Sequence, residues 1–133
     1  MRGGPNILVI EDNPANLDLV AYLLRAHGFA PRLAANGADG LRLALDEPPD
    51  LILLDLRMSG IDGYEIAARL KPQPSLKDTR IVAVTASAML DDRSRIAEAG
   101  FDGYLRKPID PETFVDDVRR FLPNRAPAVA ERG

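Results

Sequence analysis

Five polar residues stand directly after short apolar runs of the sequence, at positions where side chains of a folded sheet can meet a ligand. They are Glu11, Asp12, Asp55, Thr85 and Lys107. Carboxylates brought close together repel one another and raise one another's pKa values, unless a cation holds them ionised. Mg²⁺ fits best, because it prefers oxygen ligands and commonly uses one or two carboxylates together with waters and a substrate phosphate. The residue types therefore predict an oxygen-based Mg²⁺ site beside a hydroxyl and an ammonium group.

Each of these residues also has a structural explanation when it is taken alone. Glu11 and Asp12 could cap a following helix and complement its dipole. Asp55 and Thr85 could be turn residues, and Lys107 could be a solvated surface lysine. The coincidence favours a site, because every one of them follows a predicted strand at the position where an open α/β sheet binds ligands.

The elements that would bring these residues together are strands and helices in alternation, which predicts an α/β protein with a parallel sheet. The runs Ile7–Ile10, Leu51–Leu54 and Ile81–Val84 are apolar almost throughout and predict central strands. Pro31–Ala34 and Tyr104–Arg106 are less apolar and predict strands nearer the edges. Because right-handed crossovers point all strands the same way, the polar residues should gather along one edge of the sheet.

Apolar residues at helical spacing predict one helix after each strand. The first helix should begin at Asn13-Pro14 and end at Gly28. The fifth should begin at Asp110-Pro111 and bury the three apolar residues that mark it. The markers of the five helices, in chain order, are Leu17, Val20, Ala21 and Leu24; Leu41, Ala44 and Leu45; Ile66, Ala67 and Leu70; the stretch 91–99; and Phe114, Val118 and Phe121.

The composition is that of one globular domain, with 133 residues of which 46% are hydrophobic and 28% charged. No apolar run approaches the roughly 20 residues that span a bilayer, and the N-terminus lacks the apolar stretch of a signal peptide, so we expect a cytoplasmic protein. The absence of cysteine excludes disulfides, thiolate catalysis and Cys-based zinc sites. A net charge of -3 gives no general reason to bind nucleic acid or an anionic membrane.

The sequence indicates one domain with short flanking segments. Residues 1–5 should form a flexible N-terminus, and residues 6–122 should form the domain itself. Residues 123–133 are rich in Pro, Ala and Arg and have no periodicity, which predicts a disordered C-terminal tail.

Four segments carry a family resemblance, and in chain order they are LVIEDN, DLILLDLRMSGIDG, IVAVTASA and GYLRKPI. As a set they resemble the receiver domain of response regulators, the CheY-like superfamily, over essentially the whole predicted domain. The resemblance implies a flavodoxin-like, doubly wound α/β fold of the (βα)5 type, whose five-stranded parallel sheet has the strand order 2-1-3-4-5. It also implies a phosphoacceptor in two-component or phosphorelay signalling, and not an enzyme beyond self-phosphorylation and self-dephosphorylation.

The resemblance implies a metal and phosphorylation site built from particular residues. Asp55 would be the phosphoacceptor and nucleophile, Asp12 a direct Mg²⁺ ligand, and Glu11 a ligand that acts mainly through water. The backbone carbonyl of Arg57 would complete the protein's share of the metal shell. The side chains of Arg57 and Ser87 would flank the route of the water that hydrolyses the acyl phosphate, and would so set its lifetime.

The same resemblance implies how the phosphoryl group is held and read out. Thr85 and Lys107 would contact its oxygens, and a cis peptide bond between Lys107 and Pro108 would aim the ammonium group into the site. Tyr104 would be the aromatic switch residue. The chain departs from the family pattern at Ser59, because proline is usual at this position, four residues after the phosphoacceptor.

The implied partners are proteins. The phosphoryl group would come from a phosphohistidine of a sensor histidine kinase or a histidine phosphotransfer protein, and the output would be a downstream protein target, with no direct binding of nucleic acid or membrane. EDNPAN together with VTASAM resembles the receivers of hybrid kinases and of single-domain regulators of the DivK type. His27 is not that phosphohistidine, since its place beside Gly28 at a predicted helix end suits a structural role.

Three other functions stay open at this point. A nucleotide-binding protein of related topology would need a glycine-rich turn after the first strand, where this chain has Glu-Asp-Asn. A hydrolase with an aspartyl-phosphate intermediate would need a second aspartate where this chain has Arg57. The third alternative is a receiver-like module that binds proteins without accepting phosphate.

Overall fold

Five short strands of mainly aliphatic residues form one parallel sheet in the order β2-β1-β3-β4-β5. The structure is a computed structural model that describes residues 4–86 and 89–123. The strands are β1 (Ile7–Ile10), β2 (Arg32–Ala34), β3 (Leu51–Asp55), β4 (Arg80–Thr85) and β5 (Gly103–Arg106). The fold class and the strand order are those predicted, with β2 and β5 at the two edges.

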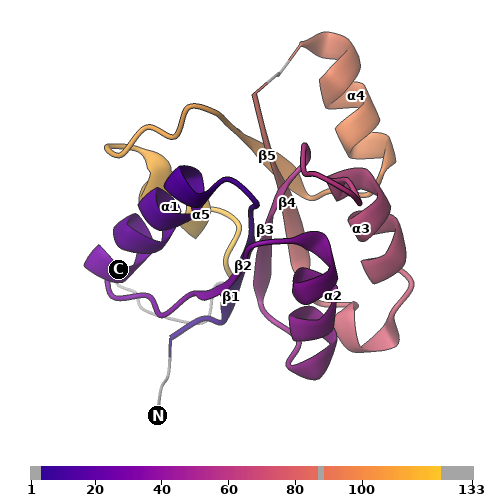
Figure 1. Ribbon diagram of the computed structural model, residues 1–133, viewed down its shortest axis with the longest axis horizontal. Helices are drawn as coiled ribbons and strands as arrows, with labels where there is room; N and C mark the ends of the chain where they lie inside the picture. The colour runs from indigo at the N-terminus through magenta and orange to yellow at the C-terminus, as the bar shows by residue number, and fades with distance from the viewer. Residues whose placement is uncertain (1–3, 87–88, 124–133) are drawn as a thin grey trace.

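Helices cover both faces of the sheet. They are α1 (Pro14–Ala26), α2 (Gly37–Asp46), α3 (Gly63–Leu70), α4 (Leu90–Glu98) and α5 (Phe114–Arg119), with a short 3-10 helix η1 (Pro74–Leu76) before β4. Figure 1 shows α1 and α5 on one face of the sheet, and α2, α3 and α4 on the other. This is a doubly wound arrangement, and it explains why the central strands are apolar almost throughout.

Two apolar cores form because successive residues of a strand point to opposite faces of the sheet. Leu8 and Ile10 of β1 belong to the core beneath α2, α3 and α4, together with residues such as Ile66 of α3. Ile7 and Val9 belong to the core beneath α1 and α5. The two cores hold the strands rigidly on both sides, which fixes the positions of the residues at the strand ends.

The helix boundaries agree with the sequence signals at α1 and differ at α5. The Asn13 side chain accepts a hydrogen bond from the Asn16 N–H at 3.0 Å, and the chain leaves α1 through Gly28, whose φ is +90°. The prediction that Asp110-Pro111 opens the last helix is wrong by one turn, because α5 begins at Phe114. The Asp110 side chain accepts from the Glu112 N–H at 2.9 Å, so residues 110–113 form a turn before the helix.

Most of the apolar markers of the helices are buried, whereas Leu17 and Leu41 are partly buried and two others depart further from the prediction. Phe114 and Val118 of α5 are 3% and 0% exposed. Phe121 is only half-buried, because it lies beyond the end of α5 and packs its ring over Gly103 of β5. Leu45 is 45% exposed, so it has helical spacing in α2 without contributing to the core.

The start of α3 lies directly against the end of β3. The Gly63 N–H donates to the Leu56 carbonyl at 3.1 Å. A Cβ atom at Gly63 would lie 2.5 Å from the Asp55 carbonyl oxygen and 2.8 Å from the Leu56 Cα. Glycine is therefore needed here for the close approach of two backbone segments, and this approach positions the loop that follows Asp55.

We predict that Gly63→Ala destabilises the fold by at least about 2 kcal/mol, because the added methyl group meets backbone atoms that cannot move without displacing β3. Helix propensity alone predicts the opposite sign, since alanine is favoured over glycine in helices by about 1 kcal/mol. Urea unfolding measures the difference. Gly4→Ala is the control, because nothing lies within 4 Å of a Cβ there. A Gly63→Ala midpoint equal to or above that of the wild type would contradict the packing argument.

Candidate functional site

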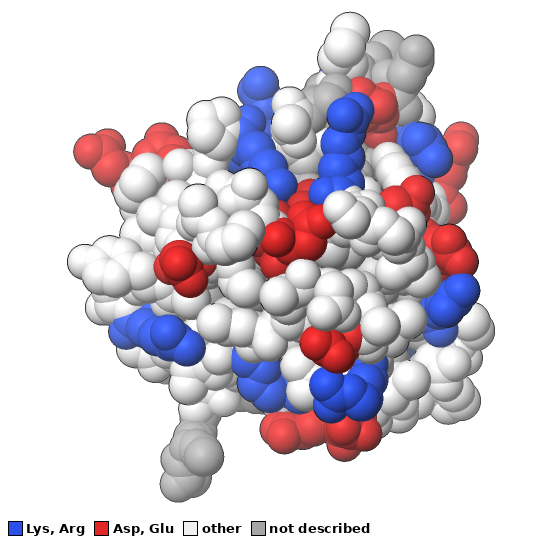
Figure 2. Space-filling model, in the orientation of Figure 1, with Lys and Arg blue, Asp and Glu red and all other residues white. Residues whose placement is uncertain are grey.

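The predicted polar residues meet at the carboxyl-terminal edge of the sheet. Glu11 and Asp12 follow β1, Asp55 and Thr85 are the last residues of β3 and β4, and Lys107 follows β5. In the orientation of Figure 1, acidic side chains gather near the centre of the visible face, with basic side chains beside them (Figure 2). The strand topology accounts for this meeting, because β1, β3, β4 and β5 are consecutive neighbours in the sheet.

The three carboxylates of this edge form a tight cluster. Glu11, Asp12 and Asp55 each offer one oxygen, and these oxygens all lie within 4.8 Å of one another. Strand register explains the contact. Ile10 of β1 pairs with Leu54 of β3, and the residues that follow this pair are Glu11 and Asp55. Glu11 and Asp55 are 4% and 3% exposed, so two of the carboxylates are shielded from water.

Lys107 supplies a positive charge in direct contact with this cluster. Its Nζ lies 3.2 Å from Glu11 Oε1 and 3.1 Å from Asp55 Oδ1. The Lys107 N–H donates to the Thr85 carbonyl at 2.8 Å, which joins the segment after β5 to the end of β4. The Lys107–Pro108 peptide bond is cis, the conformation that the family resemblance implies. One ammonium group therefore contacts two of the three carboxylates.

The environment of Glu11 disfavours its charged form. The pKa of Glu11 is raised from its ordinary value of 4.5 to about 7; burial is the largest cause, and the hydrogen bond with Asp55 and the charge of Asp55 add to the rise. The Asn13 N–H, 3.2 Å from Glu11 Oε2, and the Lys107 ammonium act in the opposite direction. A hard divalent cation suits this donor set, because clustered carboxylate oxygens are what such an ion prefers.

Backbone N–H groups orient the other two carboxylates. The Arg57 N–H donates to Asp55 Oδ1 at 3.1 Å, and the Ser59 N–H donates to Asp12 Oδ2 at 2.9 Å. Both donors lie in the segment between β3 and α3. The N–H groups of this segment therefore hold one oxygen of each carboxylate. The second oxygen of each carboxylate receives no hydrogen bond from them and can contact a ligand.

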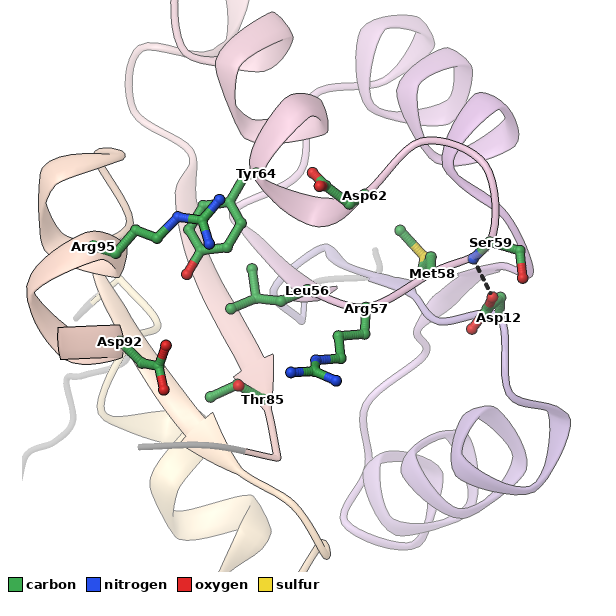
Figure 3. Close-up of a pocket in the computed structure, with 10 residues that line it drawn as sticks. All are labelled: Asp12, Leu56, Arg57, Met58, Ser59, Asp62, Tyr64, Thr85, Asp92 and Arg95. Atoms are coloured by element: carbon green, nitrogen blue, oxygen red, sulfur yellow. Dashed lines mark hydrogen bonds between the residues drawn. The ribbon is translucent and has the colours of Figure 1, made fainter. Parts of the chain in front are cut away.

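A cavity of about 540 Å³ opens beside the cluster and is lined by Asp12, Arg57 and Thr85 (Figure 3). Figure 3 shows the Arg57 side chain reaching across the cavity toward Thr85. The outer wall is formed by Tyr64 of α3 and Arg95 of α4, whose guanidinium carbon lies 4.0 Å from the centre of the Tyr64 ring. A ligand larger than a single ion can therefore reach the carboxylates from this side.

The structure places the remaining predicted residues as follows. Tyr104 of β5 is half-buried and lines a second cavity, between β5 and α5, that Lys107 and Pro108 also line. Ser87 lies outside the described residues. His27 is at the end of α1, with its Nδ1 2.9 Å from the Leu23 carbonyl, which fits the structural role expected for it.

Sequence reasoning did not find the outer wall of the first cavity. Tyr64 and Arg95 belong to no local motif, and they meet only because α3 and α4 cover the same face of the sheet. The available signal was weak: Asp92 and Arg95 are three residues apart on α4, so they share one face of a helix that follows Thr85.

The fold and the edge together define a doubly wound α/β protein with a carboxylate cluster and a lysine where such sheets bind ligands. Residues 7–119 match the family model of the response regulator receiver domain, and the chain belongs to this family. It is therefore a receiver domain of two-component signalling, a class of signalling modules. Membership also disfavours the nucleotide-binding and hydrolase alternatives.

Similar proteins agree with this assignment. The polar-differentiation response regulator DivK of Brucella anthropi is 34% identical over 117 residues, which cover 88% of this chain and 95% of the relative. The chemotaxis protein CheY4 of Vibrio cholerae matches with a TM-score of 0.85 and 26% identity, covering 90% of this chain and 100% of that chain. The receiver domain of the sensor histidine kinase PA1611 of Pseudomonas aeruginosa, solved with a magnesium ion in its active site cleft, matches with a TM-score of 0.80 and 33% identity, covering 90% and 98%.

Within residues 4–86 and 89–123, no helix is both long and apolar enough to cross a membrane. The apolar side chains of these helices contribute to the two cores of the sheet.

We predict that Glu11 makes the stability of the metal-free protein depend on pH. Its pKa is raised from 4.5 to about 7 by folding, so between these values the folded protein holds a proton that the unfolded chain has released. The free energy of unfolding in the presence of a chelator should therefore decrease as the pH rises from 4.5 to about 7, and this contribution should then be lost.

Urea unfolding at a series of pH values measures the effect. Glu11→Gln should flatten the decrease, whereas Glu98→Gln, at an exposed position of α4, should keep it. Equal pH dependence in the wild type and in Glu11→Gln would show that the Glu11 carboxyl titrates normally.

Proposed function

We propose that this receiver domain accepts a phosphoryl group on Asp55 in a Mg²⁺-dependent reaction, and that phosphorylation switches its interactions with other proteins. The observation that carries the proposal is the Asp55 carboxylate itself. It is 3% exposed, lies 3.1 Å from the Lys107 ammonium and belongs to a cluster with two further carboxylates. A buried, ionised carboxylate held by a lysine and an N–H group is oriented for nucleophilic attack on phosphorus.

Mg²⁺ would be held by Asp12, Asp55 and the backbone carbonyl of Arg57, with Glu11 acting mainly through water. The fit of the donor set supports this assignment, because the carboxylate oxygens cluster within 4.8 Å and include a glutamate whose pKa is already raised by burial and by Asp55. When bound, Mg²⁺ would offset charge on the phosphoryl oxygens and keep the carboxylates ionised. The magnesium ion in the receiver of PA1611 supports the same choice of metal.

The residues around Asp55 would share the chemistry of phosphoryl transfer. A carboxylate oxygen of Asp55 forms the new bond to phosphorus in line with the donor nitrogen, which leaves with the electron pair of the broken bond. No general base is needed, because an ionised carboxylate carries no proton to remove. Lys107 and the Thr85 hydroxyl would bind the phosphoryl oxygens, and their placement at the ends of neighbouring strands supports these roles.

Hydrolysis of the acyl phosphate would be the domain's own reverse step. Arg57 is exposed, and its side chain crosses the cavity toward Thr85, which supports a role in covering the phosphoryl group and slowing the entry of water. Ser87, two residues after Thr85, would flank the same route. Self-phosphorylation and self-dephosphorylation would then be the only reactions of the domain, so it would act as a switch and not as an enzyme on other substrates.

The phosphoryl donor would be a phosphohistidine on a sensor histidine kinase or a histidine phosphotransfer protein, and the output would be a downstream protein in the cytoplasm. The domain responsible would span residues 6–122, with residues 1–5 and 123–133 as flanking segments. The net charge of -3 gives no general electrostatic reason to bind nucleic acid, which supports a protein target.

The output would pass through Thr85 and Tyr104. Ala83 of β4 pairs with Tyr104 of β5, and Thr85 pairs with Arg106, so the hydroxyl and the aromatic ring lie on adjacent strands. A phosphoryl group at Asp55 adds about -1.5 to -2 charges and strong acceptors that would draw the Thr85 hydroxyl inward. The half-buried Tyr104 ring would then move into the space behind Thr85 and change the surface of β5 and its neighbouring helices.

We predict that the protein gains one acid-labile phosphoryl group when it is incubated with acetyl phosphate and Mg²⁺. Asp55→Asn should prevent the gain, because the amide is not a nucleophile of the same kind, and a chelator should prevent it as well. Asp78→Asn, at an exposed position after η1, should react like the wild type. Intact-mass spectrometry decides. A wild-type mass that stays unchanged with both acetyl phosphate and phosphoramidate, while Mg²⁺ binds, would favour the alternative of a protein-binding module that does not accept phosphate.

A further inference from the structure

Each carboxylate of the site accepts a backbone N–H, but the three donors differ in origin. Glu11 accepts from Asn13 at 3.2 Å, and Asp55 accepts from Arg57 at 3.1 Å, in both cases two residues further along the chain. Asp12 accepts from Ser59 at 2.9 Å, which is 47 residues away. The bond to Asp12 therefore joins two separate loops, the one after β1 and the one after β3.

Asp12 also differs from its neighbours in its charged partners. Lys107 contacts Glu11 and Asp55, whereas in the part of the chain that the structure describes Asp12 forms no salt bridge. Asp12 is half-buried, and its side chain lines the open cavity (Figure 3). The orientation of this carboxylate thus depends on the Ser59 N–H far more than those of Glu11 and Asp55 depend on their own N–H donors.

We propose that the backbone at Ser59 positions Asp12 for Mg²⁺: its N–H holds one carboxylate oxygen and leaves the other free for the cation. The inference rests on the proposed function, because it takes Asp12 as a direct ligand of the metal. Ser59 is a positioning residue through its backbone, and its hydroxyl takes no part. Proline, which is usual at this position in the family, supplies no N–H, so this way of orienting Asp12 is a feature of this chain and not of the family pattern.

The same bond holds the second loop in place. Ser59 is two residues after Arg57, whose carbonyl is a further proposed ligand, and it precedes Gly60, where φ is +83° and the loop turns toward α3. Without the bond, the Asp12 side chain and the loop would each have to be ordered when the metal binds. Contacts that orient a metal ligand in this way typically change metal affinity by about 10-fold to 100-fold.

Mg²⁺ titration by calorimetry, with no phosphodonor present, tests the proposal on two variants of one residue. Ser59→Ala removes the hydroxyl and keeps the N–H, so its Mg²⁺ affinity should stay within about twofold of the wild type. Ser59→Pro removes the N–H, and its affinity should fall by about tenfold. Equal affinities of Ser59→Ala and Ser59→Pro, with normal binding by the wild type, would overturn this inference alone. No Mg²⁺ binding by any of the three proteins would overturn the proposed function, and this inference with it.

Amide hydrogen exchange of Ser59, followed by NMR, tests the same bond without a proline. The Ser59 N–H should be protected in the metal-free wild type, should exchange at least about tenfold faster in Asp12→Ala, and should stay protected when Mg²⁺ is added. This measurement decides the matter if Ser59→Pro shifts the urea midpoint and so disturbs the fold. An unprotected Ser59 amide in the wild type, or a loss of protection on adding Mg²⁺, would overturn the proposal, because the bond would then be absent or would compete with the metal.

Discussion

Three carboxylates at one edge of the sheet repel one another, and this repulsion governs what the site can bind. Parallel strands with right-handed crossovers bring Glu11, Asp12 and Asp55 within 4.8 Å of one another, and the core beneath them shields two of the three from water. The Lys107 ammonium contacts two of these carboxylates and offsets part of their charge. Burial raises the pKa of Glu11 and Asp55 adds to the rise, so added positive charge is favourable at this edge.

The rest of the structure holds this arrangement in place. Both faces of the sheet are covered by helices, so the strand ends cannot move independently. Gly63 lets α3 begin against the backbone of Asp55, and the Lys107 N–H joins the segment after β5 to the end of β4. A change of charge at Asp55 therefore acts on neighbouring strands through short, direct contacts. This is the physical basis for a switch in which one added group alters a surface beyond the site.

Much of the fold follows from local sequence signals, because the strands are apolar almost throughout and the caps of α1 are explicit in Asn13 and Gly28. The meeting of the carboxylates also follows, since their positions after strands are visible in the sequence. The strand order came from the family resemblance and not from periodicity. The start of α5 was missed because Asp110 forms a turn, and the Tyr64–Arg95 wall and the Ser59–Asp12 bond were missed because they join segments that only the tertiary structure brings together.

If the acidic edge binds a divalent cation and presents Asp55 to a phosphoryl group, both ligands should be visible there together. A crystal structure of the protein with Mg²⁺ and beryllofluoride, which mimics the phosphoryl group, is the decisive measurement. We expect the beryllofluoride on an Asp55 oxygen, the metal in contact with Asp12 and Asp55, and the Lys107 ammonium on the fluorine atoms instead of between Glu11 and Asp55. Beryllofluoride and metal bound elsewhere, with Lys107 still bridging those two carboxylates, would contradict it.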